Sequence, residues 1–114
     1  MTKTKRKLDF TTSDTKTVSS KKNNIEIYVG GYKNNKKQGR GVYHYHNGDT
    51  YDGMYDDDKK NGDGVYVSIA TGRTYSGKWK DDKMHGSGVM TNKKEKYVGE
   101  WDFGKLIRKK QIIH

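Results

Sequence analysis

One short phrase of aromatic residues and glycines recurs four times along the chain, and this repetition limits the fold more than any other feature. Each copy opens with Tyr-x-Gly-x-aromatic, and the opening tyrosines stand 22 to 24 residues apart. In the first three copies a Gly-x-Gly pair and a valine follow. Self-similarity at such a period is the signature of a repeat architecture. The residues of the repeat are Tyr28, Gly30, Tyr32, Gly39 and Gly41; Tyr51, Gly53, Tyr55, Gly62 and Gly64; Tyr75, Gly77, Trp79, Gly86 and Gly88; and Tyr97, Gly99 and Trp101.

Each copy of the phrase predicts a β-hairpin. Alternate residues of a strand point to the same face, so Tyr75, Gly77 and Trp79 are expected to share one face. Residues that tolerate the left-handed conformation of tight turns stand midway along each copy. We expect Trp79 opposite Gly86 and Gly77 opposite Gly88, so that each large ring covers bare backbone on its partner strand. The turn residues are Asn34 and Asn35, Asp57 and Asp58, Asp81 and Asp82, and Gly104.

The links between copies are predicted to be hairpins as well. Asn47-Gly48 between alternating residues is typical of a type I′ turn, and Thr71-Gly72 stands at the corresponding place in the next link. The sheet is expected to begin at residues 25–29. The expected fold class is therefore all-β, an elongated and twisted antiparallel meander of successive hairpins.

The spacing of these residues resembles the MORN repeat family. Tyr-x-Gly-x-Trp/Tyr is followed by Gly-x-Gly at a period near 23, over about three full repeats and a partial C-terminal one between Tyr28 and about Gly104. Tyr32 and Tyr55 stand where that family prefers Trp. Arg108 and Lys110 replace the glycine pair in the last copy, which is expected to be a terminal cap. The resemblance implies a non-enzymatic repeat.

Composition determines what kind of core such a chain can form. Apolar residues are 29% and charged residues 33% of the chain, which alone would indicate disorder. Nine tyrosines and two tryptophans change that conclusion, because rings laid over glycine backbone supply burial. The net charge of +10 favours a partner with an acidic surface, either a protein, an anionic lipid or a nucleic acid.

Several classes of chemistry and location are disfavoured by what the sequence lacks. Without cysteine there are no disulfides, thiolate nucleophiles or cysteine-based zinc sites. No apolar run is long enough for a membrane span or a signal peptide. We therefore expect an intracellular protein, cytoplasmic or at a cilium or the cytoskeleton, and the nucleus less than these.

The two ends of the chain differ from the repeats. Residues 1–24 are expected to be a basic tail, extended or ordered by a partner; residues 25–104 the repeat domain; and residues 105–114 a C-terminal cap or hook. The final segment is consistent with a closing strand, a short helix or an exposed hook, with a closing strand as the default. Candidate partner-binding residues are Lys5, Arg6, Lys7, Leu8, Phe10, Leu106, Ile107, Ile112 and Ile113.

No catalytic, cofactor-binding or metal-binding residue is expected. His44 and His46 share a strand face, but spacing suggests no third ligand. Asp56-Asp57-Asp58 lacks the spacing of a calcium loop and is explained by the turn. The glycine pairs lack the helix and the Lys-Ser/Thr of a phosphate loop. Nucleic-acid binding by base stacking is disfavoured, since rings that cover glycine cannot stack with bases.

Three functions remain, and the first is preferred. The resemblance implies a scaffold or interaction protein, a structural subunit of a larger assembly such as a ciliary or cytoskeletal complex, with other proteins as partners. The second is peripheral binding to anionic membrane lipids, which the positive charge permits. The third is a structural component of a large DNA virus particle, suggested by the lysine-rich composition.

Overall fold

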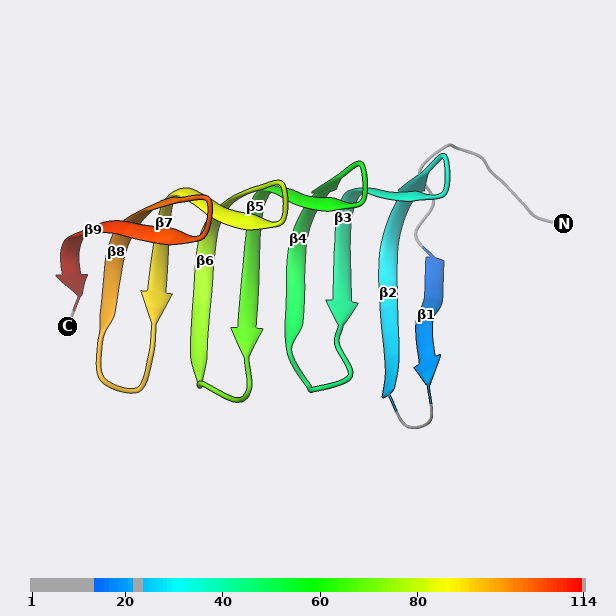
Figure 1. Ribbon diagram of the computed structural model, residues 1–114, viewed down its shortest axis with the longest axis horizontal. Coiled ribbons are helices and arrows are strands. Elements are labelled where there is room, and N and C mark those ends of the chain that lie inside the picture. Colours follow the sequence, from blue (N-terminus) through cyan, green and yellow to red (C-terminus); the bar gives the residue numbers. More distant parts are fainter. Residues whose placement is uncertain (1–13, 22–23, 114) are drawn as a thin grey trace, which may run out of the picture.

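The computed structural model describes residues 14–21 and 24–113, which form one antiparallel sheet. Its strands pair in the order in which they occur in the chain, as Figure 1 shows. The prediction of an all-β meander of hairpins is confirmed. The molecule is elongated, with extents of 53 × 30 × 23 Å. The strands are β1 (Asp14–Lys21), β2 (Asn24–Lys33), β3 (Lys36–His44), β4 (Thr50–Asp56), β5 (Lys59–Ser68), β6 (Arg73–Lys80), β7 (Lys83–Thr91), β8 (Lys96–Asp102) and β9 (Lys105–Ile113).

The turns within the repeats have the geometry that their residues favour. In the third copy, Asp81 and Asp82 have φ angles of 47° and 72°, and Lys80 pairs with Lys83 across the turn. Positive φ at both central residues is the mark of a type I′ turn. The first two copies use Asn34 and Asn35, and Asp57 and Asp58, in the same way, and the last uses Phe103 and Gly104.

The register within a repeat is only partly as expected. Gly77 does lie opposite Gly88. Trp79, however, lies opposite Met84 and not opposite Gly86, because the register shifts between Gly77 and Trp79. Gly86 occupies this bulge with φ +88°, a conformation that glycine adopts at little cost. The expected pairing of Trp79 with Gly86 is therefore wrong.

From the second phrase onward, the second aromatic residue instead lies beside a glycine of the preceding repeat. Trp79 pairs with Gly62 across the β5–β6 boundary, and Trp101 pairs with Gly86 across the β7–β8 boundary. The Trp79 indole N–H donates a hydrogen bond of 3.1 Å to the carbonyl oxygen of Gly64. The second aromatic therefore joins one repeat to the repeat before it.

The ring that covers glycine within a repeat belongs to the opening tyrosine. A Cβ placed on Gly88 would overlap the ring of Tyr75, and one placed on Gly77 would overlap the backbone of Gly88. The hydroxyl of Tyr75 donates a 2.8 Å hydrogen bond to the carbonyl oxygen of Lys78, which fixes the ring in this place. Tyr28 and Tyr51 cover Gly41 and Gly64 in the same way.

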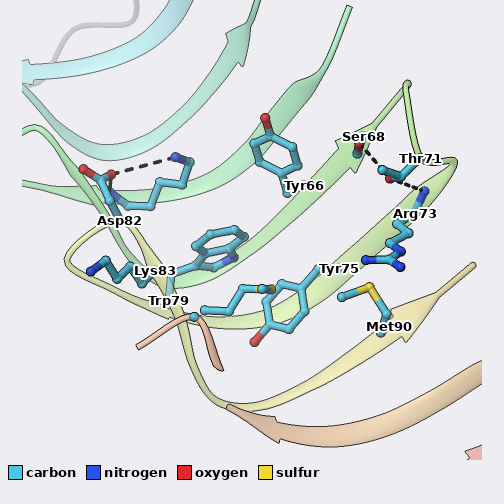
Figure 2. A pocket seen from close by; sticks show the side chains of 12 residues that line it. Tyr66, Ser68, Thr71, Arg73, Tyr75, Trp79, Asp82, Lys83 and Met90 are labelled. Carbon is cyan, nitrogen blue, oxygen red and sulfur yellow. Dashed lines mark hydrogen bonds and ion pairs between the residues drawn. The ribbon is translucent and has the colours of Figure 1, made fainter. Parts of the chain in front are cut away.

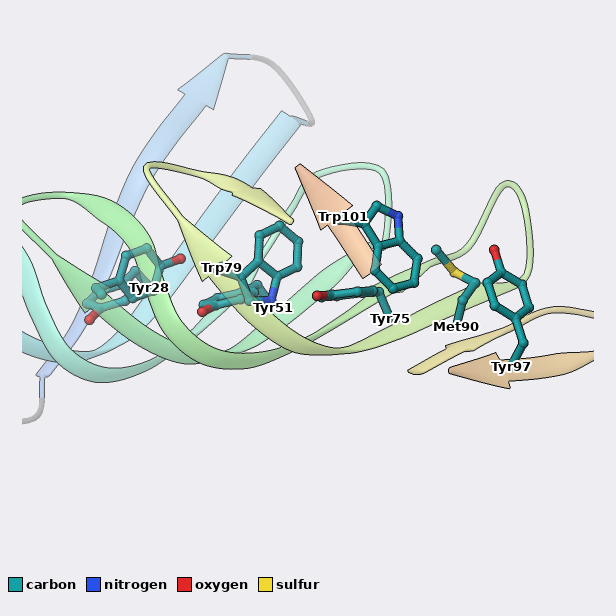
Figure 3. Close-up of a cluster of buried hydrophobic side chains, with 8 residues drawn as sticks. Tyr28, Tyr51, Tyr75, Trp79, Met90, Tyr97 and Trp101 are labelled. Carbon is teal, nitrogen blue, oxygen red and sulfur yellow. The ribbon is translucent and has the colours of Figure 1, made fainter. Parts of the chain in front are cut away.

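These rings form a continuous core along the sheet, part of which Figure 3 shows. Tyr75 packs edge to face against Trp79 of its own repeat, with ring centroids 5.3 Å apart, and against Trp101 of the next, at 4.9 Å. Tyr51 makes the same contacts with Tyr55 and Trp79. Edge-to-face pairs add about 0.5–1.5 kcal/mol beyond the area that they bury. The ladder of rings thus replaces an aliphatic core.

The links and both ends of the sheet differ from the simplest expectation. In the first link Gly48 has φ +96°, but Asn47 is not among the described residues with positive φ. The N–H of Gly48 bonds the Tyr45 carbonyl oxygen at 3.0 Å, so this link is not the expected type I′ turn. The sheet begins with β1 and not at residue 25, and its last strand is β9, which excludes a short helix there.

Candidate functional site

The hairpin tips fold over one face of the sheet, each toward the preceding repeat, as Figure 1 shows. This face, which we call the aromatic face, carries the core rings and the partly buried side chains that pack against them. The partly buried members are Tyr32, Tyr43, Tyr45, Tyr66 and Met84. These partly buried side chains lie over the ladder of core rings. A ligand that binds to the aromatic face would therefore contact them.

Two lysines lie among the rings of the aromatic face. The Lys60 ammonium is 5.5 Å from the ring centroids of both Tyr51 and Trp79, and 5.7 Å from that of Tyr66. Lys37 lies in the same way above Tyr28, with its ammonium 5.8 Å from the ring centroid. Burial lowers the pKa of Lys60, and the nearby carboxylate of Asp82 offsets this effect only in part.

A carboxylate in the turn of the next repeat holds each of these lysines. Asp82 Oδ1 accepts a hydrogen bond of 2.9 Å from the backbone N–H of Lys60, and the Asp82 N–H donates one of 3.0 Å to the Lys60 carbonyl oxygen. Asp58 makes the same pair of bonds to Lys37, at 2.8 and 3.0 Å. The bond from the Lys37 N–H helps to lower the pKa of Asp58. Each hairpin tip is thereby fastened to the repeat before it.

A tyrosine bonded to a carboxylate completes the surface of each of the first two repeats. Tyr66 donates a 2.7 Å hydrogen bond to Asp49, which is buried and also accepts one of 2.9 Å from the N–H of Ile69. Burial alone would raise the pKa of Asp49, but these hydrogen bonds outweigh it and lower the pKa. Tyr43 donates a 2.8 Å hydrogen bond to Glu26 in the first repeat.

The third repeat has a different residue at each position that holds one of these lysines, tyrosines or carboxylates in the first two repeats. The residue nine after the opening tyrosine is Met84 where the first two copies have lysine, and the residue fifteen after it is Met90 where they have tyrosine. Two residues before the opening tyrosine, Arg73 replaces the carboxylate. Gly104 stands in the following turn where the earlier turns have Asp58 and Asp82.

These changes leave a hollow of about 450 Å³ on the aromatic face between the second and third repeats. Figure 2 shows Trp79, Tyr75 and Met90 around it, with the guanidinium of Arg73 beside Tyr75 and Met90. Met84 also lines it. In the described part of the chain, the guanidinium of Arg73 makes no hydrogen bond or ion pair. The consensus phrase of the repeat does not indicate this hollow, although an alignment of the copies at these positions does.

The residues named from the sequence fall into two sets. Those of the repeat build the sheet and its core. Of the candidate partner-binding residues, Leu106, Ile107 and Ile112 are exposed on β9, and Ile113 ends that strand. Lys5, Arg6, Lys7, Leu8 and Phe10 lie outside the described residues.

The described residues bring together no group of three histidine, cysteine, aspartate or glutamate side chains that could hold a metal ion. His44 and His46 therefore find no third ligand there. No helix among residues 14–21 and 24–113 is long and apolar enough to cross a membrane.

Comparison with known protein families matches the MORN repeat model at three consecutive segments, residues 28–50, 51–69 and 75–94. No curated protein matches the chain. MORN repeats are generally non-catalytic and occur in scaffold and membrane-binding proteins. The matched segments cover more than half of the chain, and their boundaries coincide with the first three copies of the phrase. The chain therefore belongs to the MORN repeat family.

Proposed function

We propose that the protein is a non-enzymatic scaffold, a structural subunit of a larger assembly such as a ciliary or cytoskeletal complex, with other proteins as its partners. The family supports this proposal, because MORN repeats are generally interaction or lipid-binding modules. The setting that we propose with it is intracellular.

The observation that carries this proposal is the free edge at the C-terminal end of the sheet. Strand β9 pairs with β8 on one side and ends the strand order, so its other edge has no neighbouring strand in the described sheet. Leu106, Ile107 and Ile112 are 36%, 49% and 47% exposed there. Exposed apolar side chains on an edge strand are typical of a surface to which another chain adds.

The fastened repeats supply the second property that a scaffold needs. The backbone and side-chain bonds from Asp58 and Asp82 tie each hairpin tip to the preceding repeat. The ring ladder continues through the same two boundaries, where Tyr28 packs against Tyr55 and Tyr51 against Trp79. A sheet joined in this way can hold partners at a fixed separation.

The test is the size of the complex that the protein forms in its native cell. We expect the tagged chain to elute in a large complex, and Ile107→Asp with Ile112→Asp to elute near its own mass. Lys59→Asp, a charge change at the exposed first residue of β5, is the control and should stay in the complex. A wild-type chain that elutes alone, or that turns over a substrate when pure, would contradict the proposal.

Binding to anionic lipid is a second candidate, favoured by the net charge of +10. Flotation with vesicles that contain phosphatidylserine separates the two. If the purified protein floats at low salt and elutes alone from cell extracts, lipid binding replaces the scaffold role.

A further inference from the structure

The third repeat has lost the groups with which the first two repeats satisfy their own surface. In the second repeat, Tyr66 and Asp49 bond each other above the core rings. The corresponding residues of the third are Met90 and Arg73, which cannot form such a bond. The result is an apolar hollow, at whose edge the guanidinium of Arg73 has no ionic partner within the described part of the chain.

The walls of the hollow favour an apolar side chain over a cation. Its floor is formed by Tyr75 and Trp79, and both Met84 and Met90 contribute flexible thioether side chains that adapt to a guest. Gly104 lines the hollow and replaces the turn carboxylate that accompanies the buried lysine in each of the first two repeats. A cationic guest would therefore find no turn carboxylate at this position, and the carboxylate of Asp82, which also lines the hollow, already pairs with Lys60.

The charges around the hollow favour an acidic neighbour for that apolar group. Lys60 and Asp82 lie together at one side, with the ammonium 3.8 Å from the carboxylate. Arg73 and Lys83 also line the hollow, and neither side chain has a hydrogen bond or ion pair among the described residues. Arginine binds a carboxylate through two parallel hydrogen bonds when both groups are free to align.

From these observations, and resting on the proposed scaffold role, we propose that the hollow binds an acidic segment of a partner protein. A large apolar side chain of that segment enters between Met84 and Met90, and a neighbouring carboxylate pairs with Arg73. A protein segment fits better than an anionic membrane. The carboxylates of Asp82 and Glu95 already pair with Lys60 and Lys109. Among the described residues, the hollow therefore offers one guanidinium without an ionic partner beside apolar walls, which suits one carboxylate next to one large apolar side chain better than a layer of many headgroups.

Two labelled peptides test the proposal on the full-length protein. Each has nine residues, with glutamates on both sides of a central phenylalanine or a central alanine. Burial of one large apolar side chain corresponds to about tenfold or more in affinity. We expect the phenylalanine peptide to bind at least tenfold more tightly than the alanine peptide, by fluorescence anisotropy at 150 mM salt. Equal affinities, or no binding of either, would overturn the proposal.

The decisive variant rebuilds the surface of the second repeat. Arg73→Asp with Met90→Tyr restores the carboxylate and tyrosine pair, fills the hollow and should weaken the phenylalanine peptide at least tenfold while the protein stays folded by circular dichroism. Lys59→Asp makes the same kind of charge change at a residue that does not line the hollow, and this variant should bind as wild type. Equal weakening by Lys59→Asp would show that net charge alone attracts the peptide.

The wild-type protein offers a readout that needs no variant. With ¹³C-methyl methionine, the phenylalanine peptide should shift the methyl signals of Met84 and Met90 and leave that of the exposed Met54 unchanged. If phosphatidylserine vesicles shift these signals and the peptide does not, the site is a lipid site and the proposal fails. If the wild-type protein binds neither peptide but still elutes in its cellular complex, the proposal for the hollow fails and the scaffold role stands.

Discussion

The two glycines of each pair are needed for different physical reasons. Gly86 has φ +88° at a bulge, where a Cβ would meet only ordinary contacts with Lys78, so its backbone conformation is what requires glycine. Gly88 has no positive φ, but a Cβ there would overlap the ring of Tyr75. The first glycine of the pair permits the bulged backbone, and the second leaves room for a tyrosine ring.

The buried lysine of the second repeat gives a prediction of increased stability. Burial lowers the pKa of Lys60, so the folded state disfavours its charged form. Lys60→Met places at this position the residue that the third repeat already has at Met84. We expect the free energy of unfolding in urea at pH 7 to be unchanged or to rise by up to about 2 kcal/mol, since a buried charge is removed. A decrease of more than about 1 kcal/mol would mean that the rings more than repay the desolvation.

A second prediction at this scale concerns acid stability. The pKa of Asp49 is lowered in the folded protein, so its contribution to stability is present above the unfolded pKa of about 3.9. That contribution is lost as the pH falls through the lower folded pKa. Asp49→Asn should destabilise the protein by about 1–3 kcal/mol at pH 7, because the bonds to Tyr66 and Ile69 are weakened.

The measurement is chemical unfolding at pH 7 and at pH 2.5. The difference between wild type and Asp49→Asn should shrink at the lower pH. Asp63→Asn, at an exposed aspartate that pairs with Lys78, is the control. A difference that stays constant with pH would contradict the lowered pKa of Asp49.

At the scale of the hairpin, the turn aspartates join neighbouring repeats. Asp82→Gly keeps a residue that tolerates positive φ, as Gly104 does in the last turn, and removes the bond to the Lys60 N–H. We expect a loss of about 0.5–1.5 kcal/mol in the free energy of unfolding. Asp81→Gly, in the same turn and also at positive φ, is the matched control. If the two variants lose the same stability, the carboxylate of Asp82 does not fasten the repeats.

The hairpins also show how much of the fold the sequence could predict. Period two and the glycine spacing were sufficient for the strands and for the pairing of Gly77 with Gly88. They could not place Trp79, because a bulge shifts the register by an amount that no local residue specifies. The type of the link at Asn47-Gly48 was also wrong, since several loops accept glycine at positive φ.

The candidate site was less predictable than the fold. The lysines among the rings depend on the folding of each tip onto the preceding repeat, which is a contact between copies and not a property of one copy. The hollow of the third repeat follows from Met84, Met90 and Arg73. Comparing the copies at these positions would have indicated the change, but the consensus phrase omits all three.

At the scale of the whole molecule, each strand contacts mainly its neighbours in the order of the chain. Stability in such an array is close to a sum of repeats and their boundaries, so damage should stay local. Trp101→Ala removes a core ring at the C-terminal end. We expect hydrogen exchange to accelerate in β7, β8 and β9, with β3 and β4 protected as in the wild type. Uniform loss of protection would show that the sheet unfolds as one unit.

The core of the first three repeats depends most on the ring of the opening tyrosine lying over a glycine of its own hairpin. A proton beneath the face of an aromatic ring is shifted upfield in its nuclear magnetic resonance spectrum, so the Hα signals of Gly88 report this contact. We expect them to lie well upfield in the wild type and to return toward ordinary values in Tyr75→Leu, while those of Gly64, which Tyr51 covers, stay upfield. Gly88 Hα signals at ordinary positions in the wild type, or unchanged in Tyr75→Leu, would contradict the account.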